Sequence, residues 1–160
     1  EGYTCTEESI PTDPNCELVW VKIRLKKKRD LLIGAYYRPD VNDKISLPLF
    51  QTSVQQALKS RNAAVLIGGD FNFPGWNWMD KTLKKGAPQP GLHHLFMDCI
   101  HDLGLEQLVE QPTRGENTLD LMLTNYPNVV PRIERNVQQL KAWPAYHNLT
   151  EEETSKSQHK

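Results

Sequence analysis

The fold is decided by residues 63–72, which read Ala-Ala-Val-Leu-Ile-Gly-Gly-Asp-Phe-Asn. The first five residues form a short apolar run, which is the pattern of a strand buried in a sheet. The two glycines then allow the chain to turn sharply at the end of that strand. Asp70 and Asn72 follow, and polar side chains just past a buried strand lie at the rim of the sheet, where a ligand reaches them. The stretch predicts either a functional site or an ordinary turn, since Gly, Asp and Asn all favour turns.

Asp70 and Asn72 are two residues apart, so in an extended segment their side chains point the same way. The first supplies a carboxylate for a cation or a proton, and the second supplies an amide that donates to a phosphate or a water. Trp76 and Trp78 follow in a loop with no obvious core role. Their rings either stack on nucleic-acid bases, brace the wall of a site, or pack as a satellite cluster against the sheet edge. The tryptophans favour a site over a simple turn.

Two strands are expected before this segment, at residues 18–25 and 31–37. The first alternates, and the side chains that it is expected to turn toward the core are Val19, Val21, Ile23 and Leu25. The second is almost entirely apolar or aromatic, as in a strand buried on both faces. The basic run at 26–29 between them is interpreted as the solvated tip of a hairpin, the alternative being a contact with a phosphate backbone.

Two helices and two further strands complete the predicted order. The first helix spans residues 46–60, with Ser46 as its cap and Pro48 in its first turn. The second has its apolar face between residues 92 and 103 and is closed by Gly104. Strands are expected at 105–109 and 118–124. The adjacent histidines at 93 and 94 are assigned no role, because consecutive residues on a helix face different ways. The order predicts an α/β fold without internal repeats.

Further polar residues lie where they can join Asp70. Tyr37 and Arg38 end a buried strand, so a phenol and a guanidinium emerge at the same rim if the two strands are neighbours. Arg114 is a loop cation able to reach a phosphate. Asp120 lies in an otherwise apolar strand, where an unpaired carboxylate is costly to bury. Its partner is either a histidine that it orients as a general base, with His147 as the candidate, or a neighbouring loop that donates hydrogen bonds.

Composition limits what the chain can be. Its 160 residues, 38% of them apolar, suffice for one domain, expected at 1–149 with a disordered polar tail at 150–160. The net charge of -1 gives no overall attraction to a polyanion, so nucleic-acid contacts must come from local patches, which weakens a pure binding-module interpretation. Three widely spaced cysteines fit a reducing compartment. No apolar run approaches the length of a membrane span, so we expect an intracellular protein without membrane contact.

Four motifs follow one another along the chain: Tyr36-Tyr37-Arg38-Pro39, Gly-Gly-Asp-Phe-Asn-Phe-Pro-Gly at 68–75, Gln111-Pro112-Thr113-Arg114, and Thr-Leu-Asp-Leu-Met-Leu-Thr-Asn at 118–125. Together they resemble the endonuclease domain of non-LTR (LINE-type) retrotransposons, within the endonuclease/exonuclease/phosphatase superfamily. The match runs from Glu17 to Asn125. Each motif is short, and the combination is specific.

The resemblance implies a two-sheet α/β sandwich flanked by helices, and Mg²⁺-assisted hydrolysis of a phosphodiester that nicks DNA, with Mn²⁺ as a substitute. Asn72 would position the phosphate, and Asp70 would assist the nucleophile or bind the metal. Tyr37 and Thr113 would contact the phosphate, and Asp120 would orient His147. The implied partners are DNA and a reverse transcriptase region of the same polyprotein, and the implied location of a functional copy is the nucleus.

Two departures from the family pattern shape the expected activity. Family members carry an Asn and a metal-binding Glu on earlier strands, whereas this chain begins after that point, so we expect its N-terminal part to be missing. The closing Ser-Asp-His motif is replaced by Ala145-Tyr146-His147. Because losing members of a catalytic unit leaves little turnover, we expect a weak or inactive nuclease. The alternatives are a catalytically dead, domesticated remnant that binds nucleic acid or protein, and a phosphatase of the same superfamily.

Overall fold

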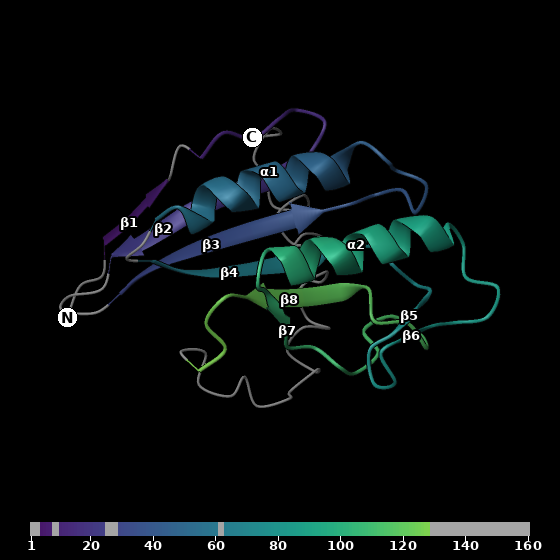
Figure 1. Cartoon of the computed structure of the whole chain (residues 1–160). Coiled ribbons are helices and arrows are strands. Elements are labelled where there is room, and N and C mark those ends of the chain that lie inside the picture. The colour runs from purple at the N-terminus through teal and green to yellow at the C-terminus, as the bar shows by residue number, and fades with distance from the viewer. Residues whose placement is uncertain (1–3, 8–9, 25–28, 61–62, 129–160) are drawn as a thin grey trace, which may run out of the picture.

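The computed structural model describes residues 4–7, 10–24, 29–60 and 63–128 (Figure 1). Its elements are β1 Thr4–Glu7, β2 Glu17–Arg24, β3 Asp30–Tyr37, α1 Ser46–Leu58, β4 Ala63–Asp70, β5 Trp76–Asn77, β6 Thr82–Leu83, α2 Pro90–Asp102, β7 Glu106–Gln107 and β8 Asp120–Thr124. The predicted disordered tail, His147 and residues 26–28 of the basic run lie outside the described residues. Both predicted helices and all five predicted strands are present.

The strands form a six-stranded sheet in the order β1-β2-β3-β4-β8-β7, and β5 and β6 form a separate two-stranded sheet. Within the large sheet β3 and β4 run parallel, and the other neighbours are antiparallel. A parallel pair needs a crossover connection, which α1 supplies between β3 and β4. The expected α/β class, with two sheets and flanking helices, is confirmed.

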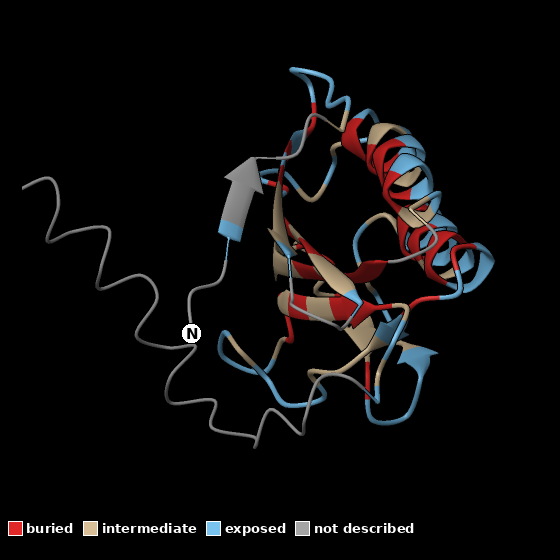
Figure 2. Ribbon diagram, turned by 90° about the vertical axis from the view of Figure 1, so that its left-hand side faces the viewer, coloured by how far each residue is buried: buried red, intermediate tan, exposed pale blue. Residues whose placement is uncertain are grey.

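Both helices lie on one face of the large sheet, and the core is the layer between the helices and the sheet (Figure 2). The helices contribute buried apolar side chains at the spacing that a helix face requires, namely Leu47, Phe50, Val54, Ala57, Leu92, Phe96 and Ile100. Phe71 and Phe73, which directly follow β4, join this core, with rings centred 5.5 and 4.2 Å from that of Phe96. The segment that carries Asp70 and Asn72 is therefore anchored by two buried aromatic rings.

The core face of β2 is opposite to the predicted one. Leu18 and Trp20 are buried under the helices, whereas Val19 is 64% exposed. The indole N–H of Trp20 donates to Ser53 Oγ of α1 at 3.0 Å, and its ring covers Gly34, where an added Cβ would lie only 2.9 Å from a ring carbon. The prediction was wrong because a glycine on the neighbouring strand leaves space for the large ring on one face only.

The other face of the sheet is partly open. The side chains of Val21, Ile33 and Leu66 are half-buried there, and Ala35 and Tyr37 are exposed. The expectation that β3 is buried on both faces is therefore wrong. This open face matters because the polar row described below lies at one end of it.

Element ends differ from the predictions at three places. The Ser46 hydroxyl does not cap α1; it is hydrogen-bonded to the Tyr36 hydroxyl, and Asp43 Oδ1 instead accepts from the N–H groups of Ile45 and Ser46 at 2.8 and 3.1 Å. β4 continues through both glycines to Asp70, so Asp70 ends the strand rather than following it. The sheet also begins with an edge strand that was not predicted, β1, which pairs with β2.

Among the described residues, no helix is both long and apolar enough to cross a membrane. Two of the three cysteines, Cys16 and Cys99, are buried and unpaired. Burial raises the pKa of the Cys16 thiol to about 11 and that of Cys99 to about 12. Both thiols are therefore protonated at neutral pH and act as small apolar side chains.

Candidate functional site

A row of three polar residues crosses the open face of the sheet where β3 and β4 end. Tyr37 of β3 pairs with Asp70 of β4, and Asp70 pairs with Asp120 of β8. Residues directly opposite one another on neighbouring strands share a face, so the phenol and the two carboxylates lie on the same side. The predicted meeting of Tyr37 with Asp70 at one rim is confirmed, and Asp120 joins them.

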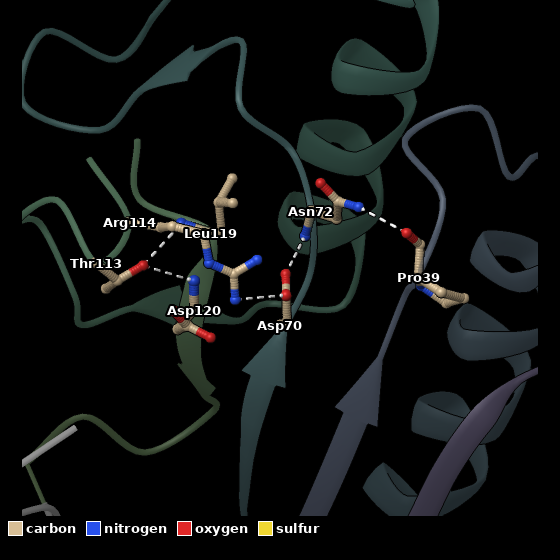
Figure 3. A network of polar contacts seen from close by, with 7 residues as sticks. All are labelled: Pro39, Asp70, Asn72, Thr113, Arg114, Leu119 and Asp120. Carbon is tan, nitrogen blue, oxygen red and sulfur yellow. Dashed lines mark hydrogen bonds and ion pairs between the residues drawn. The ribbon is translucent and has the colours of Figure 1, made fainter. Parts of the chain in front are cut away.

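Asp70 lies in the middle of this row, and its surroundings raise its pKa. Burial raises its pKa and the neighbouring Asp120 carboxylate raises it further, whereas Arg114 and the Asn72 N–H act against that rise. Arg114 reaches over from its loop, and its Nη2 lies 3.1 Å from Asp70 Oδ2 (Figure 3). The Arg114 side chain is 63% exposed and that of Asp70 only 13%. A half-buried carboxylate with a raised pKa beside the exposed guanidinium of an arginine is an arrangement typical of functional sites.

The loop before β8 is built around Thr113. The Thr113 Oγ accepts from the N–H groups of Leu119 and Asp120, both at 3.0 Å (Figure 3). Its hydroxyl hydrogen is left to donate to another group. Arg114 and Asn117 pair across a tight turn, and Lys84 Nζ donates to Asn117 Oδ1 at 2.8 Å. The loop therefore holds both Arg114 and the start of β8 in place.

Asn72 does not point the same way as Asp70. Its backbone is left-handed, with φ of 51°, because its N–H donates back to Asp70 Oδ1 at 3.0 Å and thereby closes a tight turn. Its Nδ2 donates to the carbonyl oxygen of Pro39 at 3.1 Å (Figure 3). The expectation of an extended segment is thus wrong, although the second Nδ2 hydrogen stays available beside the row.

Arg38 is not placed for the predicted contact with phosphate. Its side chain is fully buried, and its Nη atoms donate to the carbonyl oxygens of Asn72, Val41 and Asp43 at 3.0, 3.0 and 2.8 Å. The guanidinium also lies 4.2 Å from the centre of the Phe73 ring. Five fixed donors suit a cluster of carbonyls as well as a phosphate, so the strand-end position alone was misleading. Arg38 ties the loop after β3 to the loop after β4.

His93, assigned no role from the sequence, supports the same loop. It is 1% exposed, its Nε2 accepts from the Gly75 N–H at 2.9 Å, and its Nδ1 lies 3.1 Å from the carbonyl oxygen of Gln89. Because Nε2 accepts, the ring is neutral with its hydrogen on Nδ1. Burial lowers the pKa of His93, and the charges of Arg38 and His94 lower it further. Only the helical position, on the buried face of α2, signalled this role in the sequence.

This geometry predicts a pH-dependent loss of stability through His93. A lowered pKa in the folded state means that protonation favours the unfolded chain, so stability is present above the ordinary pKa and is lost as pH falls through the folded value. At pH 7.5, His93→Gln is expected to lower the free energy of unfolding by about 1–2 kcal/mol. It should also make the decline from pH 7.5 to 5 shallower than in the wild type, as measured by urea unfolding. The exposed neighbour gives the control: His94→Gln removes only the smallest cause of the lowered His93 pKa, so it should keep most of the wild-type decline. An unchanged decline in His93→Gln would contradict this role.

A divalent cation fits the chemistry of the row. Mg²⁺ is commonly held by one or two carboxylates together with waters and substrate phosphates. Asp70 and Asp120 supply such carboxylates on paired positions, and the Asp120 charge adds to the rise that burial causes in the Asp70 pKa. Among the described residues, no group of three or more His, Cys, Asp or Glu side chains gathers. The two aspartates are thus the candidate ligands.

Comparisons with known proteins bear on this site. A family model described as Endonuclease-reverse transcriptase matches residues 31–159. Among solved structures, the chain is similar to the "Endonuclease domain of TRAS1, a telomere-specific non-LTR retrotransposon", with 17% sequence identity and a TM-score of 0.54. The similarity covers 84% of this chain and 61% of that one, so the chain spans less than two thirds of that domain. No curated protein matches. At this identity the structural likeness supports the fold.

Proposed function

The chain belongs to the endonuclease-reverse transcriptase family, and from its site we propose that it is a metal-dependent nuclease domain that nicks DNA. The observation that carries this proposal is the row of Tyr37, Asp70 and Asp120 on three neighbouring strands, with Arg114 reaching the middle carboxylate. The row combines carboxylates for a metal and a proton with donors for a phosphate. Phosphoryl transfer needs that combination, because its catalysis is mostly positioning and charge stabilisation.

Four side chains are proposed to hold the scissile phosphate. Tyr37 is 48% exposed and donates through its phenol, and Thr113 donates the hydroxyl hydrogen that its backbone contacts leave unused. Asn72 donates the Nδ2 hydrogen that does not bind Pro39. Arg114 has four further N–H donors besides the one on Asp70. Neutral donors and one cation together suit a phosphodiester, which carries a single negative charge.

Asp70 is proposed to take the proton of the attacking water. Its raised pKa makes it a stronger base than an ordinary aspartate, and Arg114 keeps it ionised in the free protein. When the phosphate draws Arg114 away, the Asp70 carboxylate becomes available. The bound Mg²⁺ or Mn²⁺ would supply charge neutralisation at the phosphate and the leaving oxygen, held by Asp70 and Asp120.

His147 is proposed as the general acid or base oriented by Asp120. It lies outside the described residues, and its approach to β8 stays a prediction. Turnover is proposed to be slow, because the described residues place no glutamate beside Asp70 to complete a three-carboxylate metal site. A reverse transcriptase region of the same polyprotein is the proposed partner, and the nucleus the proposed location.

Conversion of supercoiled plasmid to open circles tests this function. With Mg²⁺ we expect slow single-strand nicking that EDTA stops. We expect little hydrolysis of p-nitrophenyl phosphate, because the proposed donors suit the single charge of a phosphodiester better than the double charge of a phosphomonoester. Hydrolysis of the phosphomonoester without nicking would support a phosphatase instead. A gel shift with plasmid fragments but no nicking at any metal concentration would support a remnant that binds DNA without cutting it.

A further inference from the structure

Arg38 carries a buried charge that the proposed chemistry does not use. Its side chain is 0% exposed, and burial lowers its pKa, although an arginine in a protein stays protonated. The hydrogen bonds that its Nη atoms form with described residues all go to backbone carbonyl oxygens, and its Nε is buried without an acceptor among those residues. Burying a guanidinium on carbonyl oxygens rather than on a carboxylate is costly. Such a placement indicates a role beyond filling the core.

The carbonyl oxygens around Arg38 come from two loops. Its Nη2 donates to those of Val41 and Asp43, in the loop after β3, at 3.0 and 2.8 Å. Its Nη1 donates to that of Asn72, in the loop after β4, at 3.0 Å. A guanidinium presents its donors in a rigid planar fork, whereas the ammonium of a lysine is a point charge on a flexible stem. An arginine at this position therefore fixes the distance between the two loops, and a lysine would not.

Asn72 is held at both ends by Arg38 and Pro39. Its carbonyl oxygen accepts from the Arg38 guanidinium. Its Nδ2 donates to the Pro39 carbonyl oxygen at 3.1 Å (Figure 3). The φ of Asn72, 51°, lies in the left-handed region, which residues other than glycine seldom adopt. The backbone N–H of Arg38 also donates to the Asp70 carbonyl oxygen at 2.9 Å, so this support lies directly beside the proposed base. The direction of the remaining Nδ2 hydrogen of Asn72 thus depends on Arg38.

We propose that Arg38 is a positioning residue for cleavage, which from inside the core sets the direction in which the Asn72 amide meets the scissile phosphate. This role rests on the proposed function and adds to it a residue that acts on the DNA only through Asn72. Orientation of a reacting group contributes mainly to the rate of the chemical step, and a small misplacement lowers that rate strongly. Affinity for DNA comes from many phosphate contacts, so misdirecting one amide changes it little. Arg38 therefore affects the rate of nicking rather than the affinity.

Two substitutions test this role. Arg38→Lys keeps the charge and loses the fork, and Arg38→Met keeps the packing on Phe73 and removes the buried charge. Nicking of supercoiled plasmid with Mg²⁺ is followed at protein concentrations that saturate the DNA, and affinity for a labelled duplex is measured by fluorescence anisotropy in EDTA. Both variants are expected to nick about 10- to 100-fold more slowly than the wild type. Their affinities for the duplex should stay within about threefold of the wild-type value.

A double-mutant cycle with Asn72 separates positioning from general support of the fold. Asn72→Gly removes the amide, and glycine adopts the φ of 51° readily. If Arg38 acts through that amide, its removal leaves Arg38 nothing to position. Arg38→Lys is therefore expected to slow the Asn72→Gly protein by less than about twofold, although it slows the wild type at least about tenfold. A residue that only stabilised the fold would slow both proteins by the same factor.

Arg24 supplies the matched control. It is exposed at the end of β2, and because β2 runs antiparallel to β3, that end lies where β3 begins, away from Asp70. Arg24→Lys should nick at the wild-type rate.

Urea unfolding shows which variants fold, and if one Arg38 variant does not fold, the other decides. Equal slowing of the wild type and the Asn72→Gly protein would overturn the positioning role and leave the nuclease proposal standing. So would wild-type nicking rates in the folded Arg38 variants, a loss confined to DNA affinity, or failure of both variants to fold. A wild type that does not nick at any metal concentration would overturn the proposed function and this role with it.

Discussion

A Gly69→Ala variant is expected to lose at least about 3 kcal/mol of folding stability, a large part of the 5–15 kcal/mol of a typical domain. Gly69 has φ of 148°, a conformation that residues with a Cβ rarely adopt. An added Cβ would also lie 1.8 Å from the backbone carbonyl oxygen of Tyr36, the residue with which Gly69 pairs on β3. Because backbone atoms cannot swing aside like a side chain, β3 and β4 would have to separate.

The preceding glycine supplies the matched control. A Cβ at Gly68 meets only the carbonyl oxygen of Leu121, at 4.0 Å, an ordinary contact. Alanine there should be neutral or raise the stability by up to about 1 kcal/mol, since glycine weakens a strand. Urea unfolding followed by tryptophan fluorescence measures both variants. Similar midpoints for Gly68→Ala and Gly69→Ala would contradict the close contact between β3 and β4 at Gly69.

The strands and helices were predictable because their apolar spacing is local. The alternation at 18–25 predicted a strand, and the spacing of Phe50, Val54 and Ala57 predicted the buried face of a helix. The choice of core face on β2 was not local, because it depends on whether the neighbouring strand leaves space for Trp20. Gly34 provides that space, and only the register of β2 with β3 places it opposite the tryptophan.

Strand ends predicted part of the candidate site, but they did not predict its contacts. Strand ends indicated that Tyr37 and Asp70 would meet, and the pairing of β3 with β4 confirms it. The same argument failed for Arg38, since a strand-end side chain alternates between faces and Arg38 points into the core. The ion pair between Arg114 and Asp70 joins residues 44 positions apart, so no sequence pattern carried it.

The contacts that support the candidate site were the hardest part to predict from the sequence. His93 bonds to Gly75, which lies 18 positions earlier, and a histidine on an apolar helix face reads as ordinary core filling. Asn72 was expected in an extended segment, and its left-handed conformation arises from a single contact with the Asp70 side chain. Such contacts depend on the folded backbone rather than on composition.

Asp70→Asn is expected to lower the rate of Mg²⁺-dependent nicking by at least about 10²-fold. The substitution keeps the shape of the side chain and removes its charge, so the proposed base and metal ligand is lost while the loops keep their geometry. The exposed Asp98 of α2 gives a control on the opposite side of the sheet, and Asp98→Asn should nick at the wild-type rate. Equal nicking by Asp70→Asn and the wild type would remove Asp70 from the catalytic machinery.

The same variant should be at least as stable as the wild type, which separates a catalytic role from a structural one. Burial and Asp120 raise the Asp70 pKa, so the folded protein holds a proton there more tightly than the unfolded chain, and the ionised carboxylate costs stability that grows as pH rises above the ordinary pKa. An asparagine avoids that cost. The lost pair with Arg114 contributes little, because the arginine is largely exposed. At pH 8 the urea midpoint of Asp70→Asn should therefore equal or exceed that of the wild type, and the difference should shrink toward pH 4. A large drop in the midpoint would instead mean that Asp70 holds the loops together, and that lost nicking reflects a damaged fold.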